Sequence, residues 1–375
     1  RVLCLVSIMD TGGAETFLMK IYRNLDRSKY QMDFCVNIAR KGFFDDEIES
    51  LGGKVYHIPS KSENLKAFKQ QLYHLIKENN YQHVLRITSN AAGFLDLKIA
   101  KKAGAQVCIA RSSNSSDGNS VKLKVVHCLG RLLYKKYVDV MLAPSDLAAI
   151  YTFGNTAYKR GKVHILHNAL NLNEYRYNSL GRKKIRNELK ISDTALVIGH
   201  IGRFNRQKNH ELLIDIFKEI HKRNYSAVLL LVGTGELKDK TREKVQNYGL
   251  SSNVIFENNR ADIPDILSAM DVLVFPSYYE GMPNIIIEAQ ANGLPCVISS
   301  AITQEANISG KLSYRDINES ISCWGDEIMK VTSQGRYDAK RDLLVKGYDI
   351  RKICEEFVAY IFENNTVKYG ELYDI

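Results

Sequence analysis

Short apolar runs alternate with amphipathic stretches along most of this chain, and this alternation limits the possible folds more than any other feature. In the first half, the apolar runs that read as candidate strands are 1–8, 31–36, 54–58, 83–88, 106–110 and 138–143. Helical periodicity lies between them, near 14–25, 64–79, 94–103 and 121–137. Strands that alternate with helices in this way predict an α/β fold with a doubly wound parallel sheet.

An Asn-rich, irregular segment interrupts this rhythm at 167–178 and is typical of a linker between domains. A basic helix is predicted after it, and further strands are predicted at 195–201, 226–232, 253–257, 271–275 and 295–299. The sequence therefore predicts two α/β domains, 1–175 and 176–349, which share a plan but show no repeat at the level of residues. The pattern alone does not assign the last predicted helix, 350–363, to either domain.

The formal net charge of +10 over 375 residues indicates an anionic partner. Nucleic acid, a phosphorylated substrate and an acidic lipid surface are the candidates, and an ordinary solvated basic surface stays open as the alternative. No spacing typical of an RRM, a KH domain or a zinc finger occurs, so no nucleic-acid partner is expected. The basic and apolar stretch 121–137 fits either contact with an anionic membrane or a domain helix with one buried face.

No apolar window reaches about 18 uninterrupted residues, so no transmembrane helix is expected. The first residues form a short run that soon becomes polar, and they read as a buried strand rather than a signal peptide. Seven cysteines are scattered without a CxxC motif or a pairing pattern. Buried free thiols in a cytoplasmic protein are the simplest interpretation of that scatter.

The stretch 279–288 combines a Gly/Pro loop with the start of a short helix, directly after the apolar run 271–275. The first amides of a helix are unpaired and lie at the positive end of its dipole, so this is a natural anion site. Two carboxylates, Glu280 and Glu288, frame it, and carboxylates are suited to hydroxyl groups rather than phosphates. A ligand that carries both a diphosphate and many hydroxyls is a nucleotide-sugar.

Two other loops of the second half also follow predicted strands. The loop 202–209 contains Arg203 and Lys208, which could both reach a diphosphate. The loop 233–236 reads Gly-Thr-Gly-Glu and allows a close backbone approach. Because the carboxyl ends of parallel strands lie at one edge of a sheet, all three loops are expected to face the same crevice.

The loops of the first half give weaker signals. Gly12 and Gly13 follow the first strand and would let the backbone approach a ligand, but they do not form a GxGxxG fingerprint. The polar segment 111–120 is expected to be a loop at the carboxyl end of the fifth strand. Loops of this kind line the ligand crevice of open α/β sheets.

In combination these motifs resemble the signature of the retaining family 4 glycosyltransferases. The matching residues are Gly202, Arg203, Lys208, Glu280 and Glu288, with seven residues between the two glutamates. The Gly12–Gly13 pair and Asn168 in the linker match in position and order, so the resemblance covers nearly the whole chain. It implies the GT-B architecture of two Rossmann-like domains with a cleft between them. It also implies that the C-terminal helix, 350–375, crosses back onto the first domain.

The resemblance implies roles for the charged residues that agree with their chemistry. Arg203 and Lys208 would neutralise the donor diphosphate as it leaves. Glu280 would contact hydroxyls of the donor sugar or balance charge on the reacting face, and Glu288 would accept hydrogen bonds from the ribose. Arg203, Lys208 and Glu280 are therefore the candidate catalytic residues.

Further residues would bind the donor. The donor-binding stretch at the helix start consists of Gly281, Met282, Pro283, Asn284 and Ile285. The backbone N–H groups available around it would hold the diphosphate and the sugar. Gly202 and Gly13 would let two loops approach the diphosphate, and Arg260 would border the nucleotide base.

The sequence contains no Asp-x-Asp triplet, and its histidines and cysteines lack metal-ligand spacing. A metal-independent reaction without a cofactor is therefore expected, in which the nucleotide-sugar is a substrate. In the retaining mechanism proposed for this fold, the leaving phosphate takes the acceptor proton, so no protein base is required.

One departure from the family concerns the sugar side. Relatives usually carry histidines at the end of the fourth strand and after the fifth, where this chain has Arg-Ile-Thr-Ser-Asn at 86–90 and Ala-Arg-Ser-Ser-Asn at 110–114. Gly12, Arg111 and Asn114 are the candidates for contact with the sugar or the acceptor. Arg111 could pair with a carboxylate or phosphate, on a uronic acid donor or a lipid-diphosphate acceptor, or it could face solvent.

The sequence thus predicts a hexosyltransferase that uses a nucleotide-sugar, most simply a UDP-sugar, in capsular or exopolysaccharide biosynthesis. A glycan or a polyprenyl-diphosphate-linked glycan is the expected acceptor, with the protein in the cytoplasm and in peripheral contact with the inner face of the plasma membrane. Two alternatives remain. A non-hydrolysing UDP-sugar epimerase shares the architecture and would epimerise free UDP-sugar without an acceptor. A non-catalytic glycosyltransferase-like subunit would bind a partner enzyme and no UDP.

Overall fold

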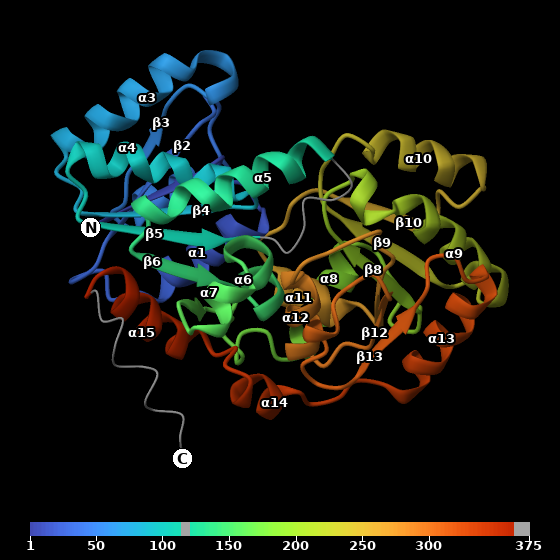
Figure 1. Cartoon of the computed structure of the whole chain (residues 1–375). Helices are drawn as coiled ribbons and strands as arrows, with labels where there is room; N and C mark the ends of the chain where they lie inside the picture. Colours follow the sequence, from blue (N-terminus) through green and yellow to red (C-terminus); the bar gives the residue numbers. More distant parts are fainter. Residues whose placement is uncertain (114–120, 364–375) are drawn as a thin grey trace. The chain divides into compact units, whose positions relative to one another are not determined.

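The computed structural model describes residues 1–113 and 121–363, and the side chains of 121–123 are not described (Figure 1). The chain divides into two compact units. The first consists of Arg1–Ala169 together with the chain from Gly347 on, and the second is the continuous stretch Leu170–Lys346. The sequence placed these divisions at 175/176 and 349/350, and the final part of its 350–375 segment lies outside the described residues.

The first unit is built on a parallel sheet with the strand order β3-β2-β1-β4-β5-β6-β7. Its strands are β1 (Val2–Val6), β2 (Met32–Val36), β3 (Val55–His57), β4 (His83–Thr88), β5 (Val107–Ser112), β6 (Val140–Ala143) and β7 (Val163–Ile165). Strands β1 and β5 are buried along their whole length, as expected for a parallel sheet covered on both faces.

Helices cover both faces of this sheet. They are α1 (Gly13–Asn24), α2 (Asp45–Ser50), α3 (Lys61–Glu78), α4 (Asp96–Ala103), α5 (Val121–Leu133), α6 (Asp146–Phe153), α7 (Asn155–Lys159) and α15 (Ile350–Ile361), with short 3-10 turns η1 (Ala91–Leu95) and η2 (Tyr134–Tyr137). Helix α15 lies against α1, where Phe357 and Phe17 meet with their ring centroids 6.5 Å apart. The last helix is therefore part of the core of the first unit.

The second unit repeats this plan with the strand order β10-β9-β8-β11-β12-β13. Its strands are β8 (Val197–Ile201), β9 (Val228–Val232), β10 (Val254–Glu257), β11 (Val272–Phe275), β12 (Cys296–Ser299) and β13 (Leu312–Arg315). Its helices are α8 (Ser179–Glu188), α9 (His210–Arg223), α10 (Lys238–Asn247), α11 (Ile263–Ala269), α12 (Asn284–Ala291), α13 (Ile321–Gln334) and α14 (Lys340–Val345), with the 3-10 turns η3 (Arg206–Lys208) and η4 (Gln304–Ala306).

Strand order explains where a ligand can bind in each unit. In the second unit the order reverses between β8 and β11, which pair directly in parallel although they are far apart in the sequence. The connections after these two strands leave in opposite directions and open a crevice at their carboxyl ends. The loops that contain Arg203 and Glu280 follow these two strands, so the fold brings both to this point.

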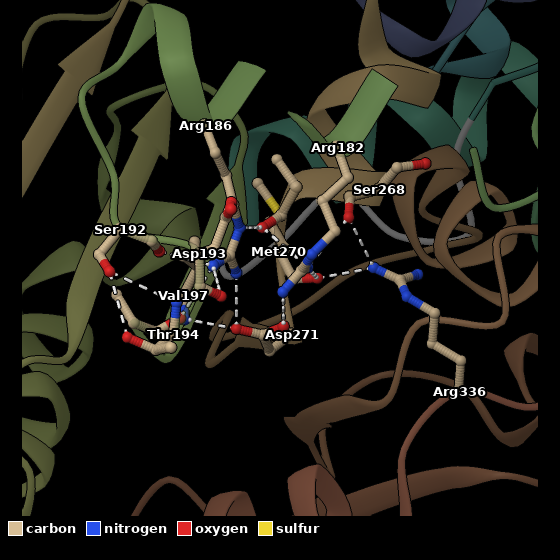
Figure 2. A network of polar contacts seen from close by, with 12 residues as sticks. Arg182, Arg186, Ser192, Asp193, Thr194, Val197, Ser268, Met270, Asp271 and Arg336 are labelled. Atoms are coloured by element: carbon tan, nitrogen blue, oxygen red, sulfur yellow. Dashed lines mark hydrogen bonds and ion pairs between the residues drawn. The ribbon is translucent and has the colours of Figure 1, made fainter. Parts of the chain in front are cut away.

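Three arginines converge on the carboxyl end of α11 and fix the chain around it (Figure 2). Arg182 and Arg336 donate to the carbonyl oxygen of Met270 at 3.2 and 2.6 Å. Arg182 and Arg186 also donate to the two carboxylate oxygens of Asp271, at 2.8 and 2.9 Å. Cations stabilise the negative end of a helix dipole, so this network ties α8 and the segment after α13 to one point of the second unit.

The predicted α/β fold with two Rossmann-like units is confirmed. The short strands β7 and β13 were not predicted, because each has few residues and carries polar side chains among its apolar ones. The predicted loop 111–120 begins too early, since β5 continues through Arg111 to Ser112. Of the described helices, none is long and apolar enough to cross a membrane.

Candidate active site

Two loops of the second unit meet through an ion pair between Lys208 and Glu280. Lys208 lies in η3 after β8, and Glu280 lies in the loop after β11. The ammonium Nζ is 2.6 Å from Oε1 of the carboxylate. Two further contacts hold the same loops together: Gln207 Nε2 donates to the carbonyl of Tyr279, and the amide of Tyr278 donates to the carbonyl of Gln207, both at 2.9 Å. The predicted cation and the predicted carboxylate are thus neighbours.

The pair is largely shielded from solvent. The side chain of Lys208 is 16% exposed and that of Glu280 is 9% exposed. The ammonium also lies 4.5 Å from the ring centre of Phe275, the last residue of β11. Charges interact more strongly where water is partly excluded, and an aromatic face adds a further attraction for the cation. Lys208 is therefore held in one place before any ligand arrives.

Two buried histidines that the sequence analysis did not single out lie beneath Lys208. His200 Nδ1 donates to the carbonyl of Val274 at 2.9 Å, and its ring stacks on Phe275. His210 packs edge-on against His200, with ring centroids 4.8 Å apart. Burial, supported by the charge of Lys208, lowers the pKa of His210 to about 4 and the pKa of His200 well below its usual range. Both imidazoles are therefore neutral at physiological pH.

Arg203 differs from Lys208 in its surroundings. Its side chain is exposed and forms no hydrogen bond or ion pair with any residue that the structure describes. It sits in the loop between β8 and η3 and follows Gly202. An exposed guanidinium without a protein partner can take a phosphate as a bidentate ligand with little rearrangement.

The glycine turn after β9 supports the Arg203 loop. A Cβ on Gly233 would lie 2.1 Å from the carbonyl oxygen of Gly202, and one on Gly235 would lie 2.4 Å from that of Phe204. The amides of Gly202 and Phe204 donate to carbonyls of Val232 and the turn at 3.0 and 2.9 Å. The predicted third ligand loop thus packs directly on the backbone of the first.

Lys238, at the start of α10, fixes this glycine turn from the other side. Its ammonium donates to the carbonyls of Gly233 and Glu257 at 2.9 and 2.7 Å, and to Asn258 Oδ1 at 2.8 Å. Burial lowers the pKa of Lys238. The sequence showed only one lysine among many in a charged helix, so nothing in the pattern marked this buried position.

The helix predicted after the Gly/Pro loop is present as α12, and anion binding at its start remains a prediction. The helix begins at Asn284 after Pro283, and no side chain caps its first amides. The loop and first-turn positions Gly281, Met282, Asn284 and Ile285 are partly exposed, whereas Pro283 is buried. Glu288 follows one turn later and is buried on the same helix. The helix start can therefore be reached by an anion, close to Glu280 along the chain.

Arg260 is already engaged with carboxylates. Its guanidinium contacts Asp262 at 2.7 Å and Glu188 at 2.5 Å. Hydrogen bonds to Asp262 and Glu188 raise the pKa of Arg260 above its usual range. Contact with a nucleotide base remains a prediction for this residue, and its guanidinium would have to leave these partners to make it.

In the first unit, Gly12 is the N-cap of α1 and Gly13 is its first residue. Gly12 is half-buried and Gly13 is exposed, at the carboxyl end of β1 next to the reversal of strand order between β1 and β4. Asn114 lies outside the described residues. The glycine pair therefore occupies the position in this unit that the loop after β8 occupies in the other.

Arg111 does not face solvent, and it does not lie in a loop. It is a residue of β5 and is 1% exposed. Its guanidinium stacks on Phe17 at 3.6 Å and donates to the carbonyl of Leu166 at 3.1 Å and to Asn168 Oδ1 at 2.6 Å. Burial lowers the pKa of Arg111. The described contacts make it a residue that orders the chain at 166–168 rather than an exposed ligand for a substrate.

Within residues 1–113 and 121–363, no group of three or more His, Cys, Asp or Glu side chains is placed to hold a metal ion. The charged groups brought together at the β8–β11 edge are Lys208 and Glu280, with Arg203 in the same loop as Lys208.

Comparison with known proteins places this geometry in context. Residues 181–309 match the family described as Glycosyl transferases group 1. EpsF of Bacillus subtilis (strain 168), which is named as a glycosyltransferase, is 33% identical over 360 residues, covering 94% of each chain. An Escherichia coli α-1,3-galactosyltransferase, named for UDP-Gal and α-D-GlcNAc-diphosphoundecaprenol, is 24% identical over 83% of this chain and 82% of its own. The capsular polysaccharide biosynthesis glycosyltransferase CapH of Staphylococcus aureus is 23% identical over 95% and 97%.

The fold also matches solved structures. The crystal structure of Anabaena HepE in complex with UDP and glucose superposes with a TM-score of 0.74, at 19% sequence identity, over 96% of this chain and 98% of HepE. HepE and this chain therefore share the GT-B fold of two Rossmann-like units.

Proposed function

We propose that this chain, which belongs to the group 1 glycosyltransferases and is a hexosyltransferase of polysaccharide biosynthesis, uses a UDP-sugar as its donor. We also propose that it retains the anomeric configuration of the transferred sugar. The acceptor is a glycan or a glycan linked to a polyprenyl diphosphate. The observation that carries the proposal is the 2.6 Å contact between Lys208 and Glu280 at the β8–β11 edge. It joins a cation suited to a diphosphate with a carboxylate suited to sugar hydroxyls.

Binding of the donor would break this ion pair and give each of its two residues a new partner on the donor. The diphosphate takes Lys208 from Glu280 and also binds the exposed Arg203, so two positive charges face the leaving group. The freed carboxylate of Glu280 accepts a hydrogen bond from a hydroxyl of the donor sugar. The amides at the start of α12 hold a phosphate, and Glu288 accepts from the ribose hydroxyls.

The transfer itself needs few further groups. The bond between the anomeric carbon and the β-phosphate oxygen breaks, and a bond from that carbon to the acceptor oxygen forms on the same face. The acceptor proton passes to the leaving phosphate, and UDP is released. Arg203 and Lys208 supply the positive charge that a metal ion supplies in other transferases, so the reaction is proposed to be independent of metal.

The relatives support the choice of donor and acceptor. HepE was crystallised with UDP and glucose, and the Escherichia coli relative is named for a UDP-galactose donor and a lipid-diphosphate acceptor. An acceptor of that kind would be reached at the inner face of the plasma membrane, so we place the protein in the cytoplasm with peripheral membrane contact.

The test is transfer or hydrolysis with a panel of UDP-, GDP- and ADP-sugars, in buffer with and without EDTA. We expect turnover with a UDP-sugar that EDTA does not reduce, and a loss of about 10²–10³ in kcat for Lys208→Ala. Glu280→Ala should also lose transfer. Normal turnover in both variants would exclude this site, and an α-to-β inversion in the product would exclude the retaining mechanism.

A control without acceptor separates this reaction from its closest alternative. Incubation with UDP-sugar alone should yield slow hydrolysis to UDP and free sugar. The appearance of an epimerised UDP-sugar would instead identify an epimerase.

A further inference from the structure

Helix α5 of the first unit carries an exposed apolar surface, which we call the α5 apolar face. Its members are Val125, Val126, Leu129, Leu132 and Leu133, and their exposed fractions lie between 39% and 73%. At about 100° per residue these positions cover an arc of about 120° around the helix. Single exposed apolar residues are ordinary, but a continuous group of five on one helix marks an interaction surface.

The opposite side of α5 shows why this face points outward. Gly130 lies so close to η1 that a Cβ there would be 2.3 Å from the amide nitrogen of Ala92. His127 accepts from the amide of Ala91 at 3.3 Å, and its other ring nitrogen donates to the carbonyl of Tyr151 at 3.1 Å. These contacts fix the rotation of the helix about its axis. The α5 apolar face therefore points away from η1 and from the core of the first unit.

The charged residues along α5 and the η2 turn after it are all cations. The stretch 121–137 contains five Lys or Arg residues and no Asp or Glu. Lys124, Lys135 and Lys136 are exposed beside the apolar residues. Lys98 of α4 adds a further cation at this end, with its ammonium 5.6 Å from the ring centre of Tyr137. An apolar strip on a segment whose charged residues are all cations is complementary to a surface that is apolar inside and anionic outside.

We propose that the α5 apolar face docks the protein onto an anionic lipid bilayer, with the helix lying in the plane of the interface. The leucine and valine side chains would enter the boundary between headgroups and acyl chains, and the lysines would meet anionic headgroups. The proposal rests on the peripheral membrane contact proposed above and assigns that contact to a surface. Because this surface involves none of the donor-site residues, a failure of vesicle binding can be told apart from a failure of sugar transfer.

A second copy of the chain is a poorer occupant of this surface. A two-fold symmetric contact would bring the same lysines of both copies together, because such an interface uses the same patch twice. The helix has 13 residues and is about 20 Å long. Stable dimers usually bury about 800 Å² on each partner, so this one helix would supply only part of such an interface. Charge therefore favours the bilayer over self-association.

The first experiment measures binding of the full chain to vesicles by co-sedimentation, with no donor or acceptor present. Vesicles of pure phosphatidylcholine are compared with vesicles that contain about 30% phosphatidylglycerol. We expect binding to the anionic vesicles that weakens as salt is raised. The double variant Leu129→Glu, Leu132→Glu should lose binding by about tenfold or more.

The matched control is Leu180→Glu, which changes an equally exposed leucine on α8 of the second unit. It should bind anionic vesicles as the unmodified protein does. Binding that survives the double variant, or that Leu180→Glu reduces equally, overturns the proposal. So does a dimer in lipid-free solution that the double variant dissociates, since that result assigns the surface to a second copy.

The second experiment keeps the face intact and uses the cysteines. Cys128 on α5 and Cys323 on α13 are exposed, and the other five cysteines are buried. A polarity-sensitive fluorophore is attached to Cys128 in a Cys323→Ser background, and to Cys323 in a Cys128→Ser background. Anionic vesicles should shift the emission of the first probe to the blue and leave the second unchanged. Equal shifts, or none at Cys128, contradict docking through α5.

Discussion

The ammonium of Lys208 and the carboxylate of Glu280 are 2.6 Å apart, although 72 positions separate them in the sequence. Each residue therefore neutralises the other before a donor is bound. A diphosphate must compete with Glu280 for Lys208, and a sugar hydroxyl gains an acceptor only when that competition succeeds. Under the proposed function, donor binding and the opening of this ion pair are one event.

The first prediction concerns the sign of the effect that each partner has on UDP affinity. Glu280→Gln releases Lys208, so UDP should bind as tightly as before or more tightly. Lys208→Met leaves the carboxylate of Glu280 without its partner next to the incoming phosphates, so affinity should fall by about tenfold or more, or about 1.4 kcal/mol. Calorimetric titration with UDP measures both. Equal losses of UDP affinity in the two variants would contradict a mechanism in which the diphosphate replaces Glu280 as the partner of Lys208.

The second prediction separates Arg203 from its neighbour Arg206. Both side chains are exposed, but only Arg203 is predicted to meet the diphosphate. Arg203→Ala should weaken UDP binding by about 1.5–3 kcal/mol, since it removes a charge-assisted hydrogen bond. Its free energy of unfolding should stay unchanged, because the exposed guanidinium forms no hydrogen bond or ion pair with a described residue. Arg206→Ala is the control, and an equal loss of UDP affinity there would indicate a general effect of surface charge.

The third prediction tests the support of the Arg203 loop. Gly233→Ala places a methyl group 2.1 Å from the carbonyl oxygen of Gly202, at a φ of +149°. The Arg203 loop must then move, and kcat/KM should fall by about tenfold or more, because small displacements of a binding group cost rate.

Gly249→Ala provides the matched comparison for this change. Gly249 also has a positive φ, of +68°, but no atom lies within 4 Å of an added Cβ. It should lose stability, by about 1 kcal/mol, while keeping kcat/KM. Full activity in Gly233→Ala would show that the turn does not position the loop.

The fourth prediction is a loss of stability in acid. Burial lowers the pKa of His210 from 6.5 to about 4. Between these values the unfolded chain binds a proton that the folded chain does not, so the free energy of unfolding falls as the pH is lowered through this window. The contribution of His210 is on the order of 3 kcal/mol.

Urea unfolding between pH 4.5 and 7.5 measures this slope. His210→Phe should flatten it, since a phenyl ring can keep the stacking on Phe204 without binding a proton. The same substitution at the exposed His74 controls for the removal of a histidine from the chain. An unchanged slope in His210→Phe would rule out this histidine as the cause.

The fifth prediction distinguishes an ordering role of Arg111 from substrate contact. Lysine cannot reach Leu166 and Asn168 while stacking flat on Phe17, so Arg111→Lys should lower the free energy of unfolding by about 1–3 kcal/mol. The KM for the acceptor should stay the same, because the guanidinium is buried. A raised acceptor KM with unchanged stability would instead support contact with the substrate.

Much of the site follows from sequence because it depends on strand ends. Lys208 and Glu280 each come just after an apolar run, and the rule that ligands bind at the carboxyl ends of parallel strands groups them without a structure. The rule does not say which strands lie next to each other in the sheet. Only the pairing of β11 with β8 makes these two loops adjacent.

The errors have a physical origin as well. Arg111 reads as the first residue of a polar segment, but the sheet continues through it, and Phe17 and Asn168 from distant parts of the chain contact its guanidinium. His200 and His210 left no periodic signal, since a single histidine in an apolar strand or at the start of a helix does not reveal its burial. Burial that depends on residues remote in sequence is not visible in a local pattern.

Helix α15 completes the core of the first unit, with Phe357 buried against Phe17. The second unit, by contrast, is one continuous stretch that ends at Lys346. During synthesis from the N-terminus, the ribosome releases every residue of the second unit before it releases α15. The usual order, in which the N-terminal domain is finished first, is therefore reversed here. Until α15 is synthesised, the core of the first unit is incomplete, and the surface of α1 that α15 covers stays exposed.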